Sequence, residues 1–101
     1  MNNIIGKVKV SQLINDNNNP AANQIVIKAP NGVYFQSYDS VVAFYNNDHK
    51  LYLGRDWDFS NTTRKHLYIF IRDYTKYCIR SRKEVLDYIK EGEFVEDESL
   101  Y

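Results

Sequence analysis

Two carboxylates flank the only tryptophan of this chain, in the run Asp56-Trp57-Asp58. Two acidic side chains two residues apart can perform acid–base chemistry when a pocket surrounds them. The pair has a second interpretation, because acidic residues just before a helix favour the positive end of its dipole. The sequence offers no nucleophile or further base at a recognisable spacing from them. We therefore favour the second interpretation and predict that the protein is not an enzyme and has no catalytic residues.

The sequence lacks the groups of neighbouring histidines and cysteines that metal binding and thiol catalysis require. His49 falls in a predicted turn and His66 on a predicted helix, and neither has another histidine or a cysteine at ligand spacing. Cys78 has basic neighbours at Lys76 and Arg80 but no nearby histidine. A single cysteine also forms no intramolecular disulfide, which fits a reducing compartment. We predict no metal site and no cofactor.

Basic side chains with interleaved tyrosines form a better candidate site. Residues 64–83 hold seven basic residues and one acidic residue, with Tyr68, Tyr74 and Tyr77 among them. Cations combined with aromatic rings suit phosphate contacts and base stacking. The same residues are also typical of the wet face of an amphipathic helix, and the net charge of zero argues against a dedicated nucleic-acid binder. The nucleic-acid-binding candidates are Arg64, Lys65, Arg72, Lys76, Arg80, Arg82 and Lys83.

Protein contacts are a second use for the unusual residues. Residues 84–101 hold seven acidic residues and one basic residue, and such carboxylates either imitate phosphates or keep a solvated tail soluble. The chain also has nine tyrosines, whose apolar ring and polar tip suit interfaces. The partner-binding candidates are Tyr34, Tyr38, Tyr52, Trp57, Glu96, Asp97 and Glu98.

Four β-rich runs between residues 22 and 53 are expected to position the tyrosines. Turn residues separate them at 30–32, 39–40 and 46–48, and Asn31-Gly32 is typical of a tight hairpin. Alternation places Ile25 and Ile27 on one face of the first strand and Val26 on the other. The sequence thus predicts an antiparallel β-meander of three or four strands.

Two helices should follow, over residues 61–73 and 82–91. Ser60 or Asn61 suits the first N-cap, Ser81 and Glu84 form a capping-box pattern, and Gly92 suits the end of the second helix. The predicted fold is α+β, with the meander packed on one face by the two helices. The predicted core is Ile25, Ile27, Val33, Phe35, Val42, Phe44, Leu51, Leu53, Leu67, Phe70, Ile71, Leu86 and Ile89.

We expect one domain over residues 1–101. Within it, residues 1–21 should form a strand, a helical turn at 11–14 and an Asn-rich loop. Residues 22–53 should form the meander, residues 54–92 the helical half and residues 93–101 an acidic tail. The amino terminus has no apolar run that suits a signal peptide or membrane span. We predict a cytoplasmic protein without membrane contact, either monomeric or a homodimer formed through edge strands or tyrosines.

Three blocks of the sequence resemble a family of small uncharacterised domains from phages and mobile elements of Gram-positive bacteria. The first block runs from Ala22 to Ala43, through Pro30-Asn31-Gly32-Val33 and Tyr38-Asp39-Ser40; the second is Trp57-Asp58-Phe59-Ser60-Asn61-Thr62-Thr63; the third is the 83–92 helix. The abundance of Asn, Ile, Tyr and Lys also suits an AT-rich genome of this kind. The resemblance carries over no catalytic residue.

The resemblance implies a phage accessory protein, and such proteins often inhibit host defence. From it we expect a non-enzymatic binding protein, most plausibly an anti-CRISPR protein that blocks a CRISPR effector in the host bacterial cytosol by covering a functional surface. The alternative is a nucleic-acid-binding accessory or regulatory protein that uses residues 64–83.

Overall fold

The computed structural model describes residues 6–100 as one six-stranded sheet with two helices. In sheet order the strands are β1 (Lys9–Ile14), β2 (Pro20–Ala29), β3 (Gly32–Ser37), β4 (Ser40–Asn46), β5 (Leu51–Leu53) and β6 (Phe94–Glu96). Consecutive strands pair antiparallel from β1 to β5, and β6 joins β5 in parallel. The helices are α1 (Asn61–Tyr74) and α2 (Arg82–Lys90). The α+β class and the meander are confirmed, and the sheet is larger than predicted.

Strand β1 begins within the predicted amino-terminal strand but continues past it, and β6 lies where the sequence predicts a tail. Ser11–Ile14 belongs to β1 rather than to a helical turn, because each residue from Lys9 to Gln12 pairs with a residue of β2. The segment predicted as a tail forms β6, since Phe94 is buried and pairs with Leu51. The predictions for residues 1–5 and 101 lie outside the described residues.

Local signals determine where both helices start as expected, whereas the hairpin turn lies one residue earlier than the predicted Asn31-Gly32. The β2–β3 loop is Pro30–Asn31, and Ala29 pairs with Gly32. A Cβ on Gly32 would lie 2.3 Å from the carbonyl oxygen of Tyr45, so the strands approach too closely there for any other residue. Ser60 caps α1 by accepting from the Thr63 amide, and Ser81 caps α2 by accepting from the Glu84 amide.

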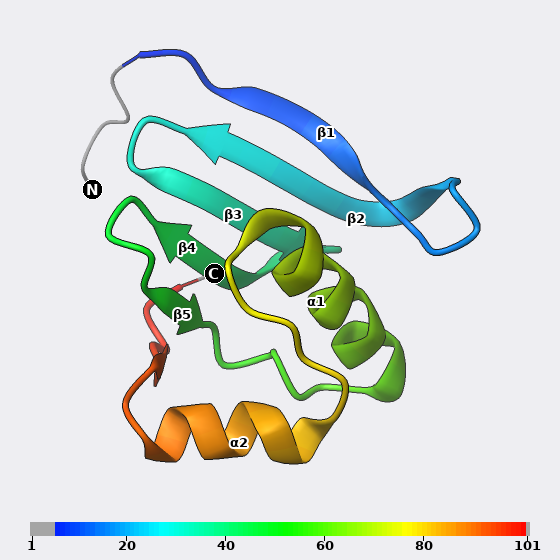
Figure 1. Ribbon diagram of the computed structural model, residues 1–101. Helices are drawn as coiled ribbons and strands as arrows, with labels where there is room; N and C mark the ends of the chain where they lie inside the picture. The colour runs from blue at the N-terminus through cyan, green and yellow to red at the C-terminus, as the bar shows by residue number, and fades with distance from the viewer. Residues whose placement is uncertain (1–5, 101) are drawn as a thin grey trace.

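Helix α1 covers one face of the sheet, and α2 lies along its β5–β6 edge (Figure 1). Helix α1 lies across β1, β3 and β4, with the Phe70 ring 5.4 Å from that of Phe35, whereas α2 contacts β6. Phe94 of β6 packs against the α1–α2 connection and α2, with its ring 4.9 Å from that of Tyr77 and 4.8 Å from that of Tyr88. We call the opposite side of the sheet the open face. Along the described part of the chain, no helix is long and apolar enough to span a membrane.

The core is built from those alternate strand residues whose side chains lie on the helix side of the sheet. Val26, Phe35, Ala43 and Leu53 occupy one register row and are all buried. The predicted core positions of Ile25, Ile27 and Phe44 are wrong, because all three lie half-buried on the open face. A bulge in β4 causes part of this change, since it lets Val42 and Ala43 both enter the core and turns Phe44 outward.

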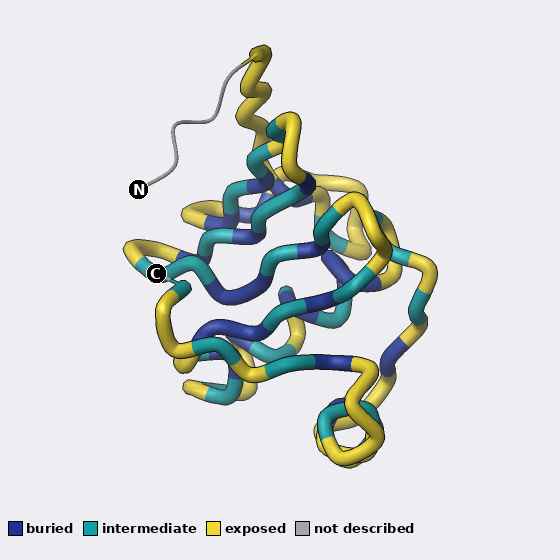
Figure 2. The backbone as a smooth tube through the Cα atoms, turned by 90° about the vertical axis from the view of Figure 1, so that its left-hand side faces the viewer, coloured by how far each residue is buried: buried dark blue, intermediate teal, exposed yellow. Residues whose placement is uncertain are grey.

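Helix α2 also buries a different residue from those that the sequence predicts for the core. Val85 is its buried residue, whereas Leu86 is 38% exposed and Ile89 is half-buried. Figure 2 shows the result along the backbone, with buried and half-buried residues alternating in the central strands and mostly exposed residues in β1.

Candidate functional site

A single row of apolar side chains crosses the open face on all six strands. Val10 of β1 pairs with Ile27, Ile27 with Tyr34, Tyr34 with Phe44, Phe44 with Tyr52, and Tyr52 with Val95 of β6. We call these six residues the open-face row. Paired residues lie on the same side of a sheet, so the row forms one continuous strip.

The centre of this row is an aromatic stack. The Tyr34 and Phe44 rings lie 4.4 Å apart at an angle of 21°, and the Phe44 and Tyr52 rings lie 6.1 Å apart. The amide of Asn31 donates to the Tyr34 hydroxyl at 2.6 Å, which holds that ring at the end of the stack. All three rings are half-buried, mainly by one another and by their strands. They therefore present a pre-ordered aromatic surface.

The positions beside the row carry one lysine in the described part of the chain, Lys50, which lies opposite Asn46 and donates through its ammonium group to the carbonyl of Gly92 at 2.8 Å. One flanking row contains Gln12, Ile25, Gln36 and Val41, and the other contains Ala29, Gly32 and Asn46. None of these paired positions is a lysine or arginine, and the lysines Lys9 and Lys28 lie in the phase that faces the helices. Lys28 instead places its ammonium group 5.5 Å from the centre of the Tyr74 ring of α1. The open face is thus apolar and uncharged at these positions.

The structure places two of the seven predicted partner-binding residues on the open-face row. Tyr34 and Tyr52 share the open-face row, whereas Tyr38 lies in the β3–β4 turn with a φ of +53°. Trp57 is only 3% exposed and belongs to the core, and its indole N–H donates to a carboxylate oxygen of Glu96 at 3.0 Å.

The two remaining acidic candidates lie beyond β6. The Asp97 amide donates to the carbonyl of Leu53, and the Asp97 carboxylate accepts from the backbone and hydroxyl of Ser99. Those hydrogen bonds hold the pKa of Asp97 below its usual value. Glu98 is exposed beside them. These carboxylates follow the sheet edge and do not join the open-face row.

The predicted basic site is largely neutralised by carboxylates. Asp58 binds Arg64 at 2.6 Å and Arg82 at 2.8 Å. Arg72 binds Asp16 and Asp73, and Lys83 binds Asp87, each at 2.8 Å. Lys76 lies 5.4 Å from the centre of the Tyr77 ring. Within residues 6–100, Lys65 and Arg80 are the members of this set whose side-chain charges have no such contact.

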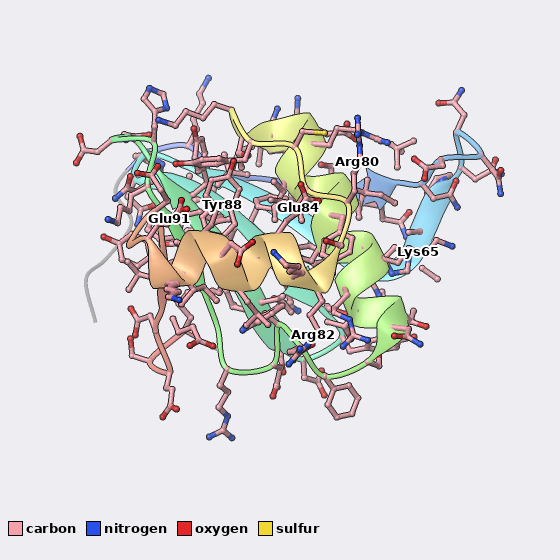
Figure 3. All side chains as sticks on the ribbon, turned by 60° about the horizontal axis from the view of Figure 1, so that its bottom comes forward. Lys65, Arg80, Arg82, Glu84, Tyr88 and Glu91 are labelled. Carbon is pink, nitrogen blue, oxygen red and sulfur yellow. The ribbon has the colours of Figure 1, made fainter. Side chains whose placement is uncertain are left out.

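Those two cations line a hollow of about 500 Å³ between α1 and the α1–α2 connection. Tyr68, Ile79 and Cys78 also line it, and burial raises the pKa of the Tyr68 hydroxyl, which therefore stays protonated at neutral pH. Figure 3 shows Lys65 on α1 apart from Glu84, Tyr88 and Glu91, which follow one another along α2. The basic residues of the sequence are therefore spread over α1, the α1–α2 connection and the start of α2.

The two aspartates beside Trp57 do not form a pair. Asp58 is held by the arginines, whereas Asp56 accepts from the Ser40 hydroxyl at 2.7 Å. His49 contacts the Tyr45 hydroxyl through its Nδ1 at 3.1 Å, and His66 lies on α1. Over residues 6–100, no three His, Cys, Asp or Glu side chains gather in a group that could hold a metal ion.

Sequence reasoning missed four members of the open-face row: Val10, Ile27, Phe44 and Val95. A signal for Ile27 existed in the hairpin itself. A hairpin with a two-residue loop pairs odd-numbered residues of β2 with even-numbered residues of β3. Tyr34 therefore lies opposite an odd-numbered residue of β2, which at this turn is Ile27. Phe44 depends on the β4 bulge and Val95 on a parallel pairing, for which local sequence has no comparable signal.

Comparison with known proteins gives a family but no activity. No curated protein and no solved structure matches the chain. A family model matches residues 8–87, which include β1 to β5, α1 and the start of α2. That family is described as a family of unknown function, DUF8033. Because the match spans well over half of the sequence, the chain belongs to the DUF8033 family.

Proposed function

We propose that this protein is a non-enzymatic binding protein that docks a partner protein on its open face. The observation that carries the proposal is the uninterrupted open-face row, from Val10 on one edge strand to Val95 on the other.

The chemistry of the row supports a binding role. An antiparallel sheet with helices on one side usually presents polar residues on the other side, where water solvates them. Here the solvent side has three stacked aromatic rings flanked by aliphatic side chains. Monomeric soluble proteins rarely expose large contiguous apolar patches without a binding function. A partner that covers the row would remove this surface from water.

The size of the face is also suitable. Six strands spaced about 4.8 Å apart span roughly 25–30 Å, and strands β1 to β4, with six or more residues each, are about 20 Å long, whereas β5 and β6 have three residues each. The face therefore measures on the order of 500 Å² in projection, which approaches the ~800 Å² that each partner buries in a standard interface. Aromatic anchors near the centre of such a face are typical hot spots of binding energy.

The scarcity of cations beside the open-face row, where Lys50 is already hydrogen-bonded to the Gly92 carbonyl, favours a protein partner over a nucleic acid. Nucleic-acid affinity depends mainly on lysine and arginine contacts with phosphates. The paired positions beside the open-face row carry amides and aliphatic groups instead. The expectation that the partner is a host-defence protein, such as a CRISPR effector, comes from the phage-family resemblance and predicts one particular outcome of the experiment below.

Tyr52→Lys tests the proposal directly. The change places a charge in the middle of the open-face row, next to the Phe44 ring. The wild-type protein is immobilised and exposed to nuclease-treated lysate of an AT-rich Gram-positive bacterium. A retained protein is identified, purified and titrated against both variants by calorimetry. We expect Tyr52→Lys to weaken its binding about thirtyfold or more, as loss of an aromatic hot spot does.

Leu86→Lys is the matched control, because Leu86 is 38% exposed on α2, away from the open face. It should bind like the wild type, and circular dichroism should show the same fold for both variants. Equal binding by Tyr52→Lys, or equal loss in Leu86→Lys, would contradict docking on the open face. Retention of a CRISPR effector whose DNA cleavage the protein then inhibits would support the host-defence expectation.

The basic hollow favours a second candidate function, nucleic-acid binding. Lys65 and Arg80 line it together with Arg64, Arg72 and the ring of Tyr68. Binding of single-stranded oligonucleotides should then weaken steeply with salt, because phosphate contacts release counterions. A double variant, Lys65→Ala with Arg80→Ala, should lose this binding, whereas Tyr52→Lys should keep it.

A further inference from the structure

A second concave site lies on the helix side of the sheet, where the β3–β4 turn meets the segment before α1. This cavity has a volume of about 280 Å³. Its lining residues are Ser37, Tyr38, Asp39, Ser40, Val42, Asp56, Phe59 and Thr63. It is separate from the open face. Ser37 pairs with the buried Gln24, and both residues lie on the helix side of the sheet. The open-face proposal therefore does not use this cavity.

The cavity is lined by a serine hydroxyl that has no hydrogen-bond partner in the described part of the chain. Ser37 is only 7% exposed, yet within residues 6–100 its hydroxyl makes no hydrogen bond. The other buried hydroxyl, that of Thr63, contacts the Ser60 hydroxyl at 3.0 Å. The Ser37 oxygen is not fully shielded from water, so water or a ligand group in the cavity can supply the missing hydrogen bond. Ser37 therefore indicates a place for a polar ligand group.

The charge of the cavity selects for cations. Asp56 receives one hydrogen bond, from Ser40 to its Oδ2, so its Oδ1 has no partner in the described part of the chain. The exposed Asp39 carboxylate has no ion-pair partner there either. The lining contains two carboxylates and no lysine, arginine or histidine. A phosphate-bearing ligand would be repelled, whereas a group with several N–H donors and a positive charge would be attracted.

Two aromatic rings border the same cavity from different segments. Phe59 is 80% exposed and Tyr38 is 63% exposed, although both line a concave site. Hydrogen bonds hold the turn that presents Tyr38, since its amide donates to the carbonyl of Asn23 at 2.8 Å. Exposed aromatic faces beside carboxylates favour a flat cation, which can stack on a ring while donating to oxygen atoms.

We propose that this cavity binds the guanidinium group of an arginine side chain presented by another protein. The planar guanidinium has five N–H donors, which match the free oxygen of Asp56, the Asp39 carboxylate and the Ser37 hydroxyl. Its flat faces suit the rings of Tyr38 and Phe59. A lysine ammonium has the charge but lacks the planar fork and the stacking surface.

NMR titration of the full-length protein with Nα-acetyl-arginine amide tests the proposal. Amide signals from residues 37–40 and 56–63 should shift in a saturable manner, with much smaller shifts for Nα-acetyl-lysine amide. The citrulline analogue has nearly the same shape without the charge, so it should bind at least about tenfold more weakly, as expected for loss of a charge-assisted hydrogen bond. Guanosine monophosphate tests whether the site selects a nucleobase instead.

Three variants assign the binding to this cavity. Asp56→Asn and Phe59→Ala should each weaken arginine binding, and Phe59→Ala should leave the fold intact because the side chain is 80% exposed. Asp48→Asn is the control, since it removes a carboxylate from the exposed β4–β5 turn. Equal binding of arginine and citrulline, preferential binding of the nucleotide, or undiminished binding in both Asp56→Asn and Phe59→Ala would overturn the proposal.

Discussion

At the scale of single residues, His66 has an environment that opposes its protonation. It lies on α1, and its Nδ1 is buried without a hydrogen-bond partner within the described residues. Burial lowers the pKa of the imidazole from 6.5; an interaction with the Thr62 backbone opposes this shift, and the positive charge of neighbouring Lys65 adds to it. The folded protein therefore favours neutral His66, whereas the unfolded chain lets it take up a proton.

The stability of the protein should consequently depend on pH through His66. As pH falls below 6.5, the unfolded state binds more protons than the folded state, so the free energy of unfolding decreases. We expect urea unfolding to show greater stability at about pH 7 than at about pH 5, and His66→Gln should reduce this difference.

His49→Asn serves as the control, because His49 is exposed in a turn at a φ of +65°, which asparagine tolerates. This variant should keep the pH difference of the wild type. If His66→Gln also kept it, the carboxylates rather than His66 would cause the acid sensitivity.

At the scale of elements, hydroxyl caps determine where both helices start. The Ser60 Oγ accepts from the Thr63 amide at 3.1 Å, and the Ser81 Oγ accepts from the Glu84 amide at 3.3 Å. The Glu84 carboxylate in turn accepts a hydrogen bond from the backbone amide of Arg80 at 2.7 Å. The Ser60 cap also positions α1 above the core, because Thr63 and Leu67 are buried in the first two turns of the helix.

Ser60→Ala should lower the free energy of unfolding by about 1 kcal/mol, since an N-cap hydroxyl satisfies an otherwise unpaired helix amide. Ser60→Asp should retain most of the stability, because aspartate caps equally well. Urea unfolding measures both. Ser11→Ala in the exposed part of β1 is a matched control, and a loss of similar size there would show that the effect does not come from the cap.

At the scale of the whole molecule, the chain returns to its own sheet after forming the helices. Both helices lie in sequence between β5 and β6, which are neighbours in the sheet. Trp57 joins the same regions, since its buried ring is in the core and its indole N–H donates to Glu96 of β6. The sheet and the helices therefore share one core and cannot lose their packing independently.

Unfolding should accordingly be a single transition. The fluorescence of Trp57, which is the only tryptophan, and the far-ultraviolet circular dichroism of the helices should change at the same urea concentration. Two separated midpoints would contradict a shared core and would indicate that α1 and α2 unfold apart from the sheet.

The sequence by itself determined the features that depend on a few adjacent residues. The Pro30–Asn31 turn, the caps at Ser60 and Ser81, and the extents of both helices follow from local hydrogen bonding and backbone preferences. Tyr34 and Tyr52 were likewise identified as surface tyrosines, because alternation along a strand is a local property.

Only the tertiary structure decided which face of the sheet the helices cover and which distant groups meet. Val26 and Ile27 are both aliphatic neighbours, and packing against α1 rather than their own chemistry buried one and left the other in the open-face row. The parallel strand β6 and the cavity between Ser37 and Phe59 join segments far apart in the chain. Such contacts depend on how whole surfaces fit together, so no short stretch of sequence contains the information that selects them.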